Sequence, residues 1–391
     1  MRKSSAKARP GEAALSHREK LRHLREILFA NVVMAGEIPA PTGGERRITR
    51  FLSDRFTESG LANISLDQAG NVAGVLPGRN GGRHLLVAAH VDKIWAETDD
   101  HTVSVGVGRM SGRGIADNSL GVAVLATLPL ILDELGVELE SNLILLGTTR
   151  SFGRGDLGGM RFFLENAEHS VDAALCLEGI ELGRLSYSSF GMARGEIEVL
   201  SPLAAADERG EEAGLRVVSV LTGLLRRLLA IHEREHPRAS VLVRSIESGS
   251  GDGVPPRSGR VCFEIRSPEP SRVARVEEEI AALVAGVNRN DVHEVRGEMI
   301  ARRSPGDLGA DHPLVAKARE ILDLLGIETH VAPSVSELAL LLERGIPSLT
   351  LGITRGENRH SPAESIRLEP IFDGLAQIVA LLQFMDRGGN S

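Results

Sequence analysis

The sequence has few cysteines and no long apolar stretch, and each of these absences excludes certain classes of protein. Its 391 residues include only Cys176 and Cys262, too few for a disulfide framework or a cysteine-rich zinc site. No uninterrupted apolar run approaches the roughly 20 residues that span a bilayer, so we expect no membrane partner. The basic N-terminal segment lacks the apolar core of a secretory signal. We therefore expect a cytoplasmic protein.

The charge balance is acidic, with 45 Lys and Arg against 53 Asp and Glu and a formal net charge of −8. This balance argues against nucleic acid as the main partner. Hydrophobic residues make up 42% of the chain and recur along most of it, which excludes low-complexity disorder. The length suggests two or three domains with enough chain to bury a core.

Buried strands and helices alternate in the first half of the chain. Continuous apolar runs at 84–92, 141–149 and 172–179 are typical of strands that are buried on both faces. Helical patterns over 120–136 and 158–167 lie between them. Strand, helix, strand, helix, strand with short links predicts an α/β fold whose mixed, largely parallel sheet is flanked by helices.

The pattern changes near residue 184, where strands with one solvated face are followed by long amphipathic helices. We expect residues 185–299 to form a smaller inserted α+β domain. The helix–strand alternation then resumes, so 20–184 and 300–391 are expected to form one larger domain. Residues 1–19 are polar and basic, and we expect a flexible extension there.

Four polar signals stand at or after the ends of predicted strands, where α/β folds usually place ligands. His90 and Asp92 lie two residues apart, so a strand would point both to one face. Asp117 precedes a helix, Glu178 ends a buried strand, and His360 follows a late strand. Such nitrogen and oxygen donors suit zinc, with manganese or cobalt as alternatives.

Each signal also has a plain structural interpretation. A histidine at a strand end is more often structural or exposed than ligating, and an aspartate before a helix is often an N-cap. Glu178 can equally be solvated. The order and context of all four together are more specific, and they favour a metal site.

These motifs resemble the M20-type zinc-dependent peptidases and amidohydrolases, including the peptidase-T-like branch, and the related M42 aminopeptidases. The matching segments, in order, are HVD, GRGIADN, LEG and HSPAES, with GNVAGVLPG upstream and GIPSLTLGI before the last. The resemblance covers nearly the whole chain beyond residue 20. It implies a zinc-peptidase-like fold whose inserted domain serves as a lid or dimerisation domain, hence a homodimer. It also implies a small peptide or N-acyl amino acid-like substrate.

The resemblance further implies a pair of metal ions that clamp a nucleophilic water. One ion would take His90, Asp117 and Glu178, and Asp92 would orient His90. The other would take Asp117, His360 and a carboxylate from a Glu-Glu pair. The first Glu of that pair is the family's general base.

The chain departs from the family pattern at the Glu-Glu pair, because Ser151 and Phe152 stand at its two positions. Serine is no base near neutral pH, and phenylalanine ligates no metal. A second departure is Ala339, which ends the family's Ser-Thr-Asp-Ala-Asn-like run. Three interpretations stay open. The chain is a one-metal hydrolase with another recruited base, a non-catalytic binding or regulatory relative, or a catalyst of a different reaction that needs one Lewis acid.

A rival motif runs from His232 to His236 and matches the H-E-x-x-H pattern of zinc peptidases. Its flanks are charged and Pro237 follows at once, so the second histidine would sit at a helix end. We therefore interpret this segment as the solvated face of a helix.

Overall fold

The computed structural model describes residues 17–201, 208–249, 251, 255–288 and 294–388. The chain divides into two compact units. The first comprises Met1–Ser188 and Asp307–Ser391, and the second comprises Ser189–Gly306.

The first unit is built around an eight-stranded sheet in the order β1-β2-β6-β3-β7-β16-β8-β15. Neighbours from β6 through β3 and β7 to β16 run parallel, while β1, β2 and β8 pair antiparallel with a neighbour. The predicted mixed, largely parallel sheet is confirmed. Its strands are β1 (Ala62–Leu66), β2 (Val72–Leu76), β3 (His84–His90), β6 (Asn142–Thr148), β7 (Ala173–Glu178), β8 (Arg184–Ser186), β15 (His330–Val331) and β16 (Ser348–Gly352).

Helices cover both faces of this sheet, because side chains on buried strands alternate between two hydrophobic clusters. Leu85 and Val87 of β3 join the larger cluster with α2, α3, α4, α8 and α10. Leu86 and Ala88 join a smaller cluster with α5 and α9. The helical segments are η1 (Arg22–Leu24), α2 (Arg25–Glu37), α3 (Arg46–Glu58), η2 (Ile115–Ser119), α4 (Leu120–Glu134), η3 (Gly153–Gly155), α5 (Gly158–Asn166), α8 (Pro313–Leu324), α9 (Leu338–Glu343) and α10 (Ile371–Asp386).

One stretch corrects an expectation from the sequence. Among the described residues, Ile115–Glu134 is long and apolar enough to cross a membrane, whereas no such run was expected. Its most apolar 18-residue window is 94% buried inside the protein, as in a core helix. The helix packs against the sheet on the side of the larger cluster.

Short strands form two further sheets. A four-stranded antiparallel sheet has the order β17-β18-β5-β4, and a separate pair joins β14 to β9. The bounds are β4 (Ser104–Gly106), β5 (Arg109–Ser111), β9 (Ser188–Ser189), β14 (Gly306–Asp307), β17 (Gly356–Glu357) and β18 (Ser365–Arg367).

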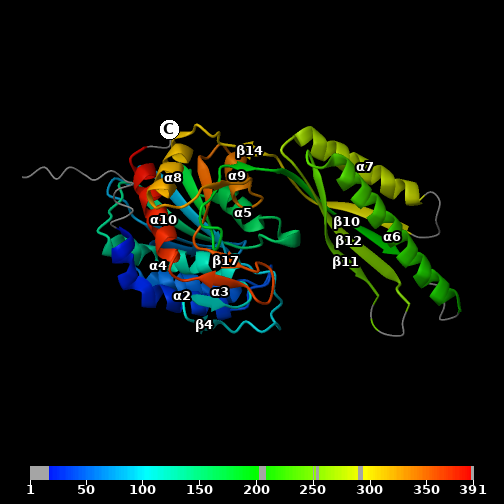
Figure 1. Cartoon of the computed structure of the whole chain (residues 1–391), viewed down its shortest axis with the longest axis horizontal. Helices are drawn as coiled ribbons and strands as arrows, with labels where there is room; N and C mark the ends of the chain where they lie inside the picture. The colour runs from blue at the N-terminus through cyan, green and yellow to red at the C-terminus, as the bar shows by residue number, and fades with distance from the viewer. Residues whose placement is uncertain (1–16, 202–207, 250, 252–254, 289–293, 389–391) are drawn as a thin grey trace, which may run out of the picture. The chain divides into compact units, whose positions relative to one another are not determined.

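The second unit is a four-stranded antiparallel sheet in the order β11-β12-β10-β13. Helices α6 and α7 run side by side along it (Figure 1). Alternate strand residues such as Ile197, Val261 and Phe263 pack against both helices in one cluster. The elements are β10 (Gly191–Leu200), α6 (Glu208–Glu235), β11 (Ser240–Ser248), β12 (Ser258–Ser267), α7 (Pro270–Asn288) and β13 (Glu294–Arg303).

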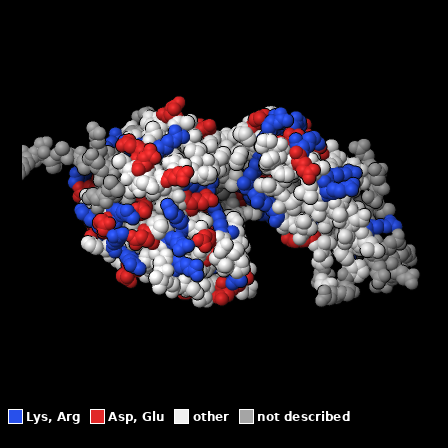
Figure 2. Space-filling model, in the orientation of Figure 1, with Lys and Arg blue, Asp and Glu red and all other residues white. Residues whose placement is uncertain are grey.

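Acidic and basic side chains are interspersed over the face of the first unit that Figure 2 shows. Exposed pairs such as Arg22 with Glu19 and Arg367 with Glu357 belong to the surface of this unit. Pairs of this kind contribute at most about 1 kcal/mol each. These surface pairs therefore contribute little to the stability of the unit.

Candidate metal centre

Three adjacent parallel strands, β6, β3 and β7, each have a polar residue at the carboxyl end. These three ends lie side by side in the sheet. His90 ends β3, Thr148 ends β6 and Glu178 ends β7. The β3–β6 register pairs His90 with Thr148, and the β3–β7 register pairs Ala88 with Cys176, two residues before each strand end. Because side chains alternate along a strand, this register puts all three on one face of the sheet.

Asp117 reaches the same edge from the turn that precedes α4. Asn118 fixes this turn, because its Nδ2 donates to the carbonyl oxygen of Leu177 at 2.8 Å and its Oδ1 accepts from the Gly121 nitrogen at 3.2 Å. Gly179 allows the close approach, since a Cβ there would lie 2.3 Å from the carbonyl oxygen of Ala116. The turn is thereby held against the end of β7, beside Glu178.

The structure brings together the residues that the sequence proposed as ligands. Ligand atoms of His90, Asp117 and Glu178 all lie within 4.8 Å of one another, and all three residues are buried. His90 Nε2 lies 2.9 Å from Asp117 Oδ1, and His360 Nε2 contacts Asp117 Oδ2. His360 is the most open of the four, with 49% of its side chain exposed.

Arg359 also enters this cluster. Its Nε donates to Asp117 Oδ2 at 3.1 Å, and its Nη2 donates to Glu178 Oε2 at 2.9 Å. One guanidinium therefore bridges the two buried carboxylates. The sequence interpretation missed Arg359, and the only signal for it was its position beside His360.

Asp92 was expected to orient His90, and the structure shows that the closest contact between them is made by the Asp92 backbone and not by its carboxylate. His90 Nδ1 lies 3.1 Å from the main-chain oxygen of Asp92, and the nearer carboxylate contact, to Oδ1, is 3.7 Å. Asp92 Oδ2 instead accepts from the backbone nitrogens of Ser151 and Phe152 and from the Thr42 hydroxyl. Asp92 thus orients His90 mainly through its backbone and anchors the loop after β6 through its carboxylate.

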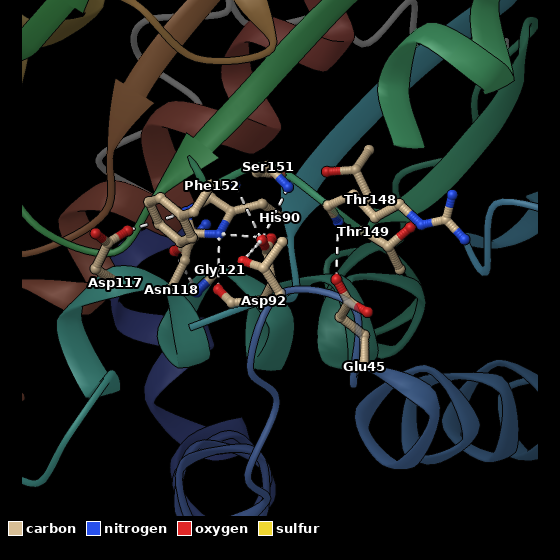
Figure 3. Close-up of polar contacts among 12 residues, drawn as sticks. Glu45, His90, Asp92, Asp117, Asn118, Gly121, Thr148, Thr149, Ser151 and Phe152 are labelled. Atoms are coloured by element: carbon tan, nitrogen blue, oxygen red, sulfur yellow. Dashed lines mark hydrogen bonds and ion pairs between the residues drawn. The ribbon is translucent and has the colours of Figure 1, made fainter. Parts of the chain in front are cut away.

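That loop places Ser151 and Phe152 against the cluster (Figure 3). The Phe152 ring meets the His90 ring edge-on, with centroids 5.1 Å apart and planes at 85°. Ser151 Oγ donates to Glu337 Oε1 at 2.8 Å, and Thr148 Oγ1 donates to the same oxygen at 3.2 Å. Glu337, which is 4% exposed, is a second residue that the sequence interpretation missed.

Glu364 ties the two loops of the cluster together. Its Oε1 accepts from the His360 nitrogen at 2.7 Å, and its Oε2 accepts from the Ala116 nitrogen at 3.3 Å. Burial raises the pKa of this carboxyl. Glu364 lies in the HSPAES motif, so its place in the motif was the available signal.

The carboxyl groups of the cluster differ in their electrostatics. Burial alone would raise the pKa of Asp117, but hydrogen bonds from His360 and His90 outweigh it and hold that pKa well below its usual range. Burial raises the pKa of Glu178, and Asp117 adds to this effect while Arg359 opposes it. Burial disfavours the charged form of His90, yet Asp117 and Asp92 raise its pKa well above the ordinary value. Environments that separate two neighbouring carboxyl groups in this way are common at functional sites.

The H-E-x-x-H segment forms no comparable cluster among the described residues. His232 Nδ1 accepts from the backbone nitrogen of Val241, and α6 ends at Glu235, before His236. The Glu235 carboxylate is bound by arginines, including Arg275 of α7. These contacts join α6 to its neighbours in the second unit.

The chain thus folds into a helix-flanked, largely parallel sheet with an inserted α+β unit, and a His-Asp-Glu cluster lies at the carboxyl ends of the strands, as the resemblance to metallopeptidases implied. The chain matches the profile of Peptidase family M20/M25/M40 over residues 86–383, and it belongs to this family. A search of curated protein sequences finds no significant match.

Solved structures with the same fold include peptidases of several organisms. A di-peptidase of Saccharomyces cerevisiae, Dug1p, is 16% identical with a TM-score of 0.73, and the match covers 96% of this chain and 99% of that chain. Human carnosine dipeptidase 1 is 13% identical with a TM-score of 0.74, at 96% and 99% coverage. A dinuclear metal-binding peptidase of the M20 family from Bacillus subtilis is 15% identical with a TM-score of 0.63, at 94% and 99% coverage. Family and neighbours support a peptide or amide hydrolase.

Proposed function

We propose that this protein is a one-metal hydrolase of peptide or amide bonds that acts on short peptides or N-acyl amino acids. The observation that carries the proposal is the buried set His90, Asp117 and Glu178, whose ligand atoms lie within 4.8 Å of one another. One imidazole and two carboxylates are a donor set that suits catalytic zinc, with manganese or cobalt as alternatives.

The residues present fit one ion and do not fit a second. A second ion would need a carboxylate where the Phe152 ring lies edge-on against His90. An aromatic ring offers no lone pair for a divalent ion. His360 is then a further ligand of the remaining site or a contact to the substrate.

A bound divalent ion would polarise the scissile carbonyl and lower the pKa of a water molecule. We assign the removal of that water's proton to Glu337, acting through Ser151. The Ser151 hydroxyl donates to Glu337 Oε1, so it can accept a proton from water as it passes its own proton to the carboxylate. When the C–N bond breaks, the same two groups return one proton to the leaving amine. Ser151 itself is unchanged by the cycle.

The first experiment is the metal content of protein that is purified without chelator. We expect about one zinc per chain in the wild type and none in His90→Ala, because that change removes the nitrogen ligand. His236→Ala is the matched control, since His236 is exposed and lies outside the cluster. Absence of metal from the wild type after zinc is offered would contradict the one-metal proposal.

The base assignment is tested with Glu337→Gln, assayed as zinc-loaded protein against a panel of dipeptides. We expect hydrolysis to fall by about 10²-fold with unchanged metal content, which is typical for loss of a general base. Glu343→Gln, an exposed residue at the end of α9, is the control. Equal rates in the wild type and Glu337→Gln would reassign the base.

The alternative function is a binding or regulatory protein that has lost catalysis, and Ser151 and Phe152 favour it. Full metal occupancy without hydrolysis of any peptide in the panel would support this alternative. A homodimer through the inserted unit and a cytoplasmic location stay predictions from the sequence.

A further inference from the structure

We infer that Arg359 is a tethered cation that occupies the carboxylates of the metal centre and must withdraw before a metal ion can bind. The inference rests on the proposed function in one respect, namely that Asp117 and Glu178 are metal ligands. It adds that the chain itself competes for those ligands.

The competition follows from the contacts of the Asp117 carboxylate. Asp117 Oδ2 already contacts both Arg359 Nε, at 3.1 Å, and His360 Nε2. The other oxygen, Oδ1, faces His90 Nε2 at 2.9 Å. A divalent cation at Oδ2 would lie against the guanidinium, so the two like charges repel and Arg359 must withdraw.

Glu178 is engaged by the same guanidinium. Arg359 Nη2 lies 2.9 Å from Glu178 Oε2, and the two ion pairs hold both carboxylates with one planar group. Burial disfavours the charged guanidinium, but Glu178 and Asp117 outweigh that cost and raise the pKa of Arg359. Arg359 thus offsets some of the repulsion between these two buried negative charges.

The guanidinium is placed to leave the site more easily than the carboxylates. The Arg359 side chain is 28% exposed, whereas those of Asp117 and Glu178 are 1% and 8% exposed. Arg359 lies between β17 and β18, outside regular secondary structure. Withdrawal therefore requires a side-chain rotation toward solvent and breaks no strand pairing.

The test is a zinc titration of chelator-stripped, full-length protein, followed with a competing fluorescent indicator and by thermal unfolding. We compare the wild type with Arg359→Gln, Arg359→Lys and the control Arg367→Gln. Arg367 is an exposed residue of β18, the strand that follows Arg359, and it pairs with Glu357. Near-UV circular dichroism checks that each variant is folded.

We expect Arg359→Gln to bind zinc about tenfold more tightly or better, because a neutral amide does not compete for both carboxylates. In chelator the same variant should unfold at a lower temperature than the wild type, and zinc should raise its Tm by more. Arg359→Lys should bind with intermediate affinity, since one ammonium lacks the fork that spans two carboxylates. Arg367→Gln should match the wild type.

Equal or weaker zinc binding by Arg359→Gln would overturn the inference. If the wild type still holds one zinc that His90→Ala loses, the proposed function stands and only the role of Arg359 falls. If Arg359→Gln gains zinc that the wild type never binds, the role of Arg359 is supported and the one-metal function of the native chain fails. If neither protein binds zinc, both ideas are overturned.

Discussion

Each unit of the protein has a buried cluster of charged side chains, and the two clusters differ in how the negative charge of their carboxylates is balanced. In the second unit, three arginines surround the single carboxylate of Glu264, which is 2% exposed. Arg194 Nη2 lies 2.8 Å from Oε2, and Arg244 Nη2 lies 3.0 Å from Oε1. In the first unit, one arginine serves both Asp117 and Glu178, and the other partners of Asp117 are histidines.

The pKa values reflect this difference. Burial would raise the pKa of Glu264, but Arg266, Arg194 and Arg244 lower it to about 2. In the other cluster the pKa of Asp117 is lowered while that of Glu178 is raised. A carboxylate with permanent cations on every side is a structural ion pair. Two carboxylates that share one guanidinium leave negative charge that a divalent ion can satisfy, and this contrast supports the proposal that the first cluster binds a metal ion.

The largest expected effect comes from adding carboxylates to the first cluster. In the double variant Ser151→Glu with Phe152→Glu, we expect a second metal per chain and a gain in peptide hydrolysis of at most about 10²-fold, because Glu337 already serves as a base in the wild type and a carboxylate at position 151 would replace its action through the Ser151 hydroxyl. Elemental analysis and dipeptide assays measure both. Ser151→Ala with Phe152→Ala is the control, in which neither quantity should rise. A folded Glu-Glu variant without gain would count against a simple loss of the family's second site.

A smaller effect is expected from removing the carboxylate of the second cluster. Glu264→Gln should lower the free energy of unfolding by about 2–3 kcal/mol, because the arginines lose a buried partner and stay near each other. Urea unfolding measures this change, and Glu247→Gln, an exposed residue of β11, is the control. Zinc binding by the first unit should be unaffected. A loss below about 0.5 kcal/mol would show that the cluster contributes little.

The smallest expected effect is the pH dependence of the contribution that Glu264 makes to the free energy of unfolding. The pKa of Glu264 is about 2 in the folded state against an ordinary 4.5, so the folded state binds fewer protons between these values. The stabilisation by Glu264 is thus fully present above about pH 5 and is lost as the pH falls through 4.5 toward 2. The difference in unfolding free energy between the wild type and Glu264→Gln should shrink from about pH 6 to about pH 3. A constant difference would contradict the ion-pair interpretation.

Much of the fold could be predicted because it depends on local patterns. The apolar runs at 84–92, 141–149 and 172–179 correspond to β3, β6 and β7, and their parallel pairing follows from the helices between them. The sequence also singled out His90, Asp117, Glu178 and His360 by their positions relative to strands. In a parallel sheet the carboxyl ends of adjacent strands meet at one edge, so these positions converge without any knowledge of the contacts.

Other features of the site depend on contacts that no local pattern encodes. Arg359 meets Asp117 across 242 residues of sequence, and Glu337 meets Ser151 across 186. Arginine and glutamate are common surface residues, and their types alone do not predict burial in a shared cluster. The backbone contact between Asp92 and His90 is equally invisible in the sequence, which showed only two polar residues at strand spacing.

The sequence by itself determined the family, the α/β architecture and the four polar residues at the sheet edge, because strand periodicity and motif order are local properties. Only the tertiary structure decided how the charges are balanced. It placed one guanidinium between Asp117 and Glu178, a phenyl ring against His90, and a buried glutamate behind Ser151. The physical reason is that electrostatic interactions depend on distance and burial in space, which separation along the chain does not reveal.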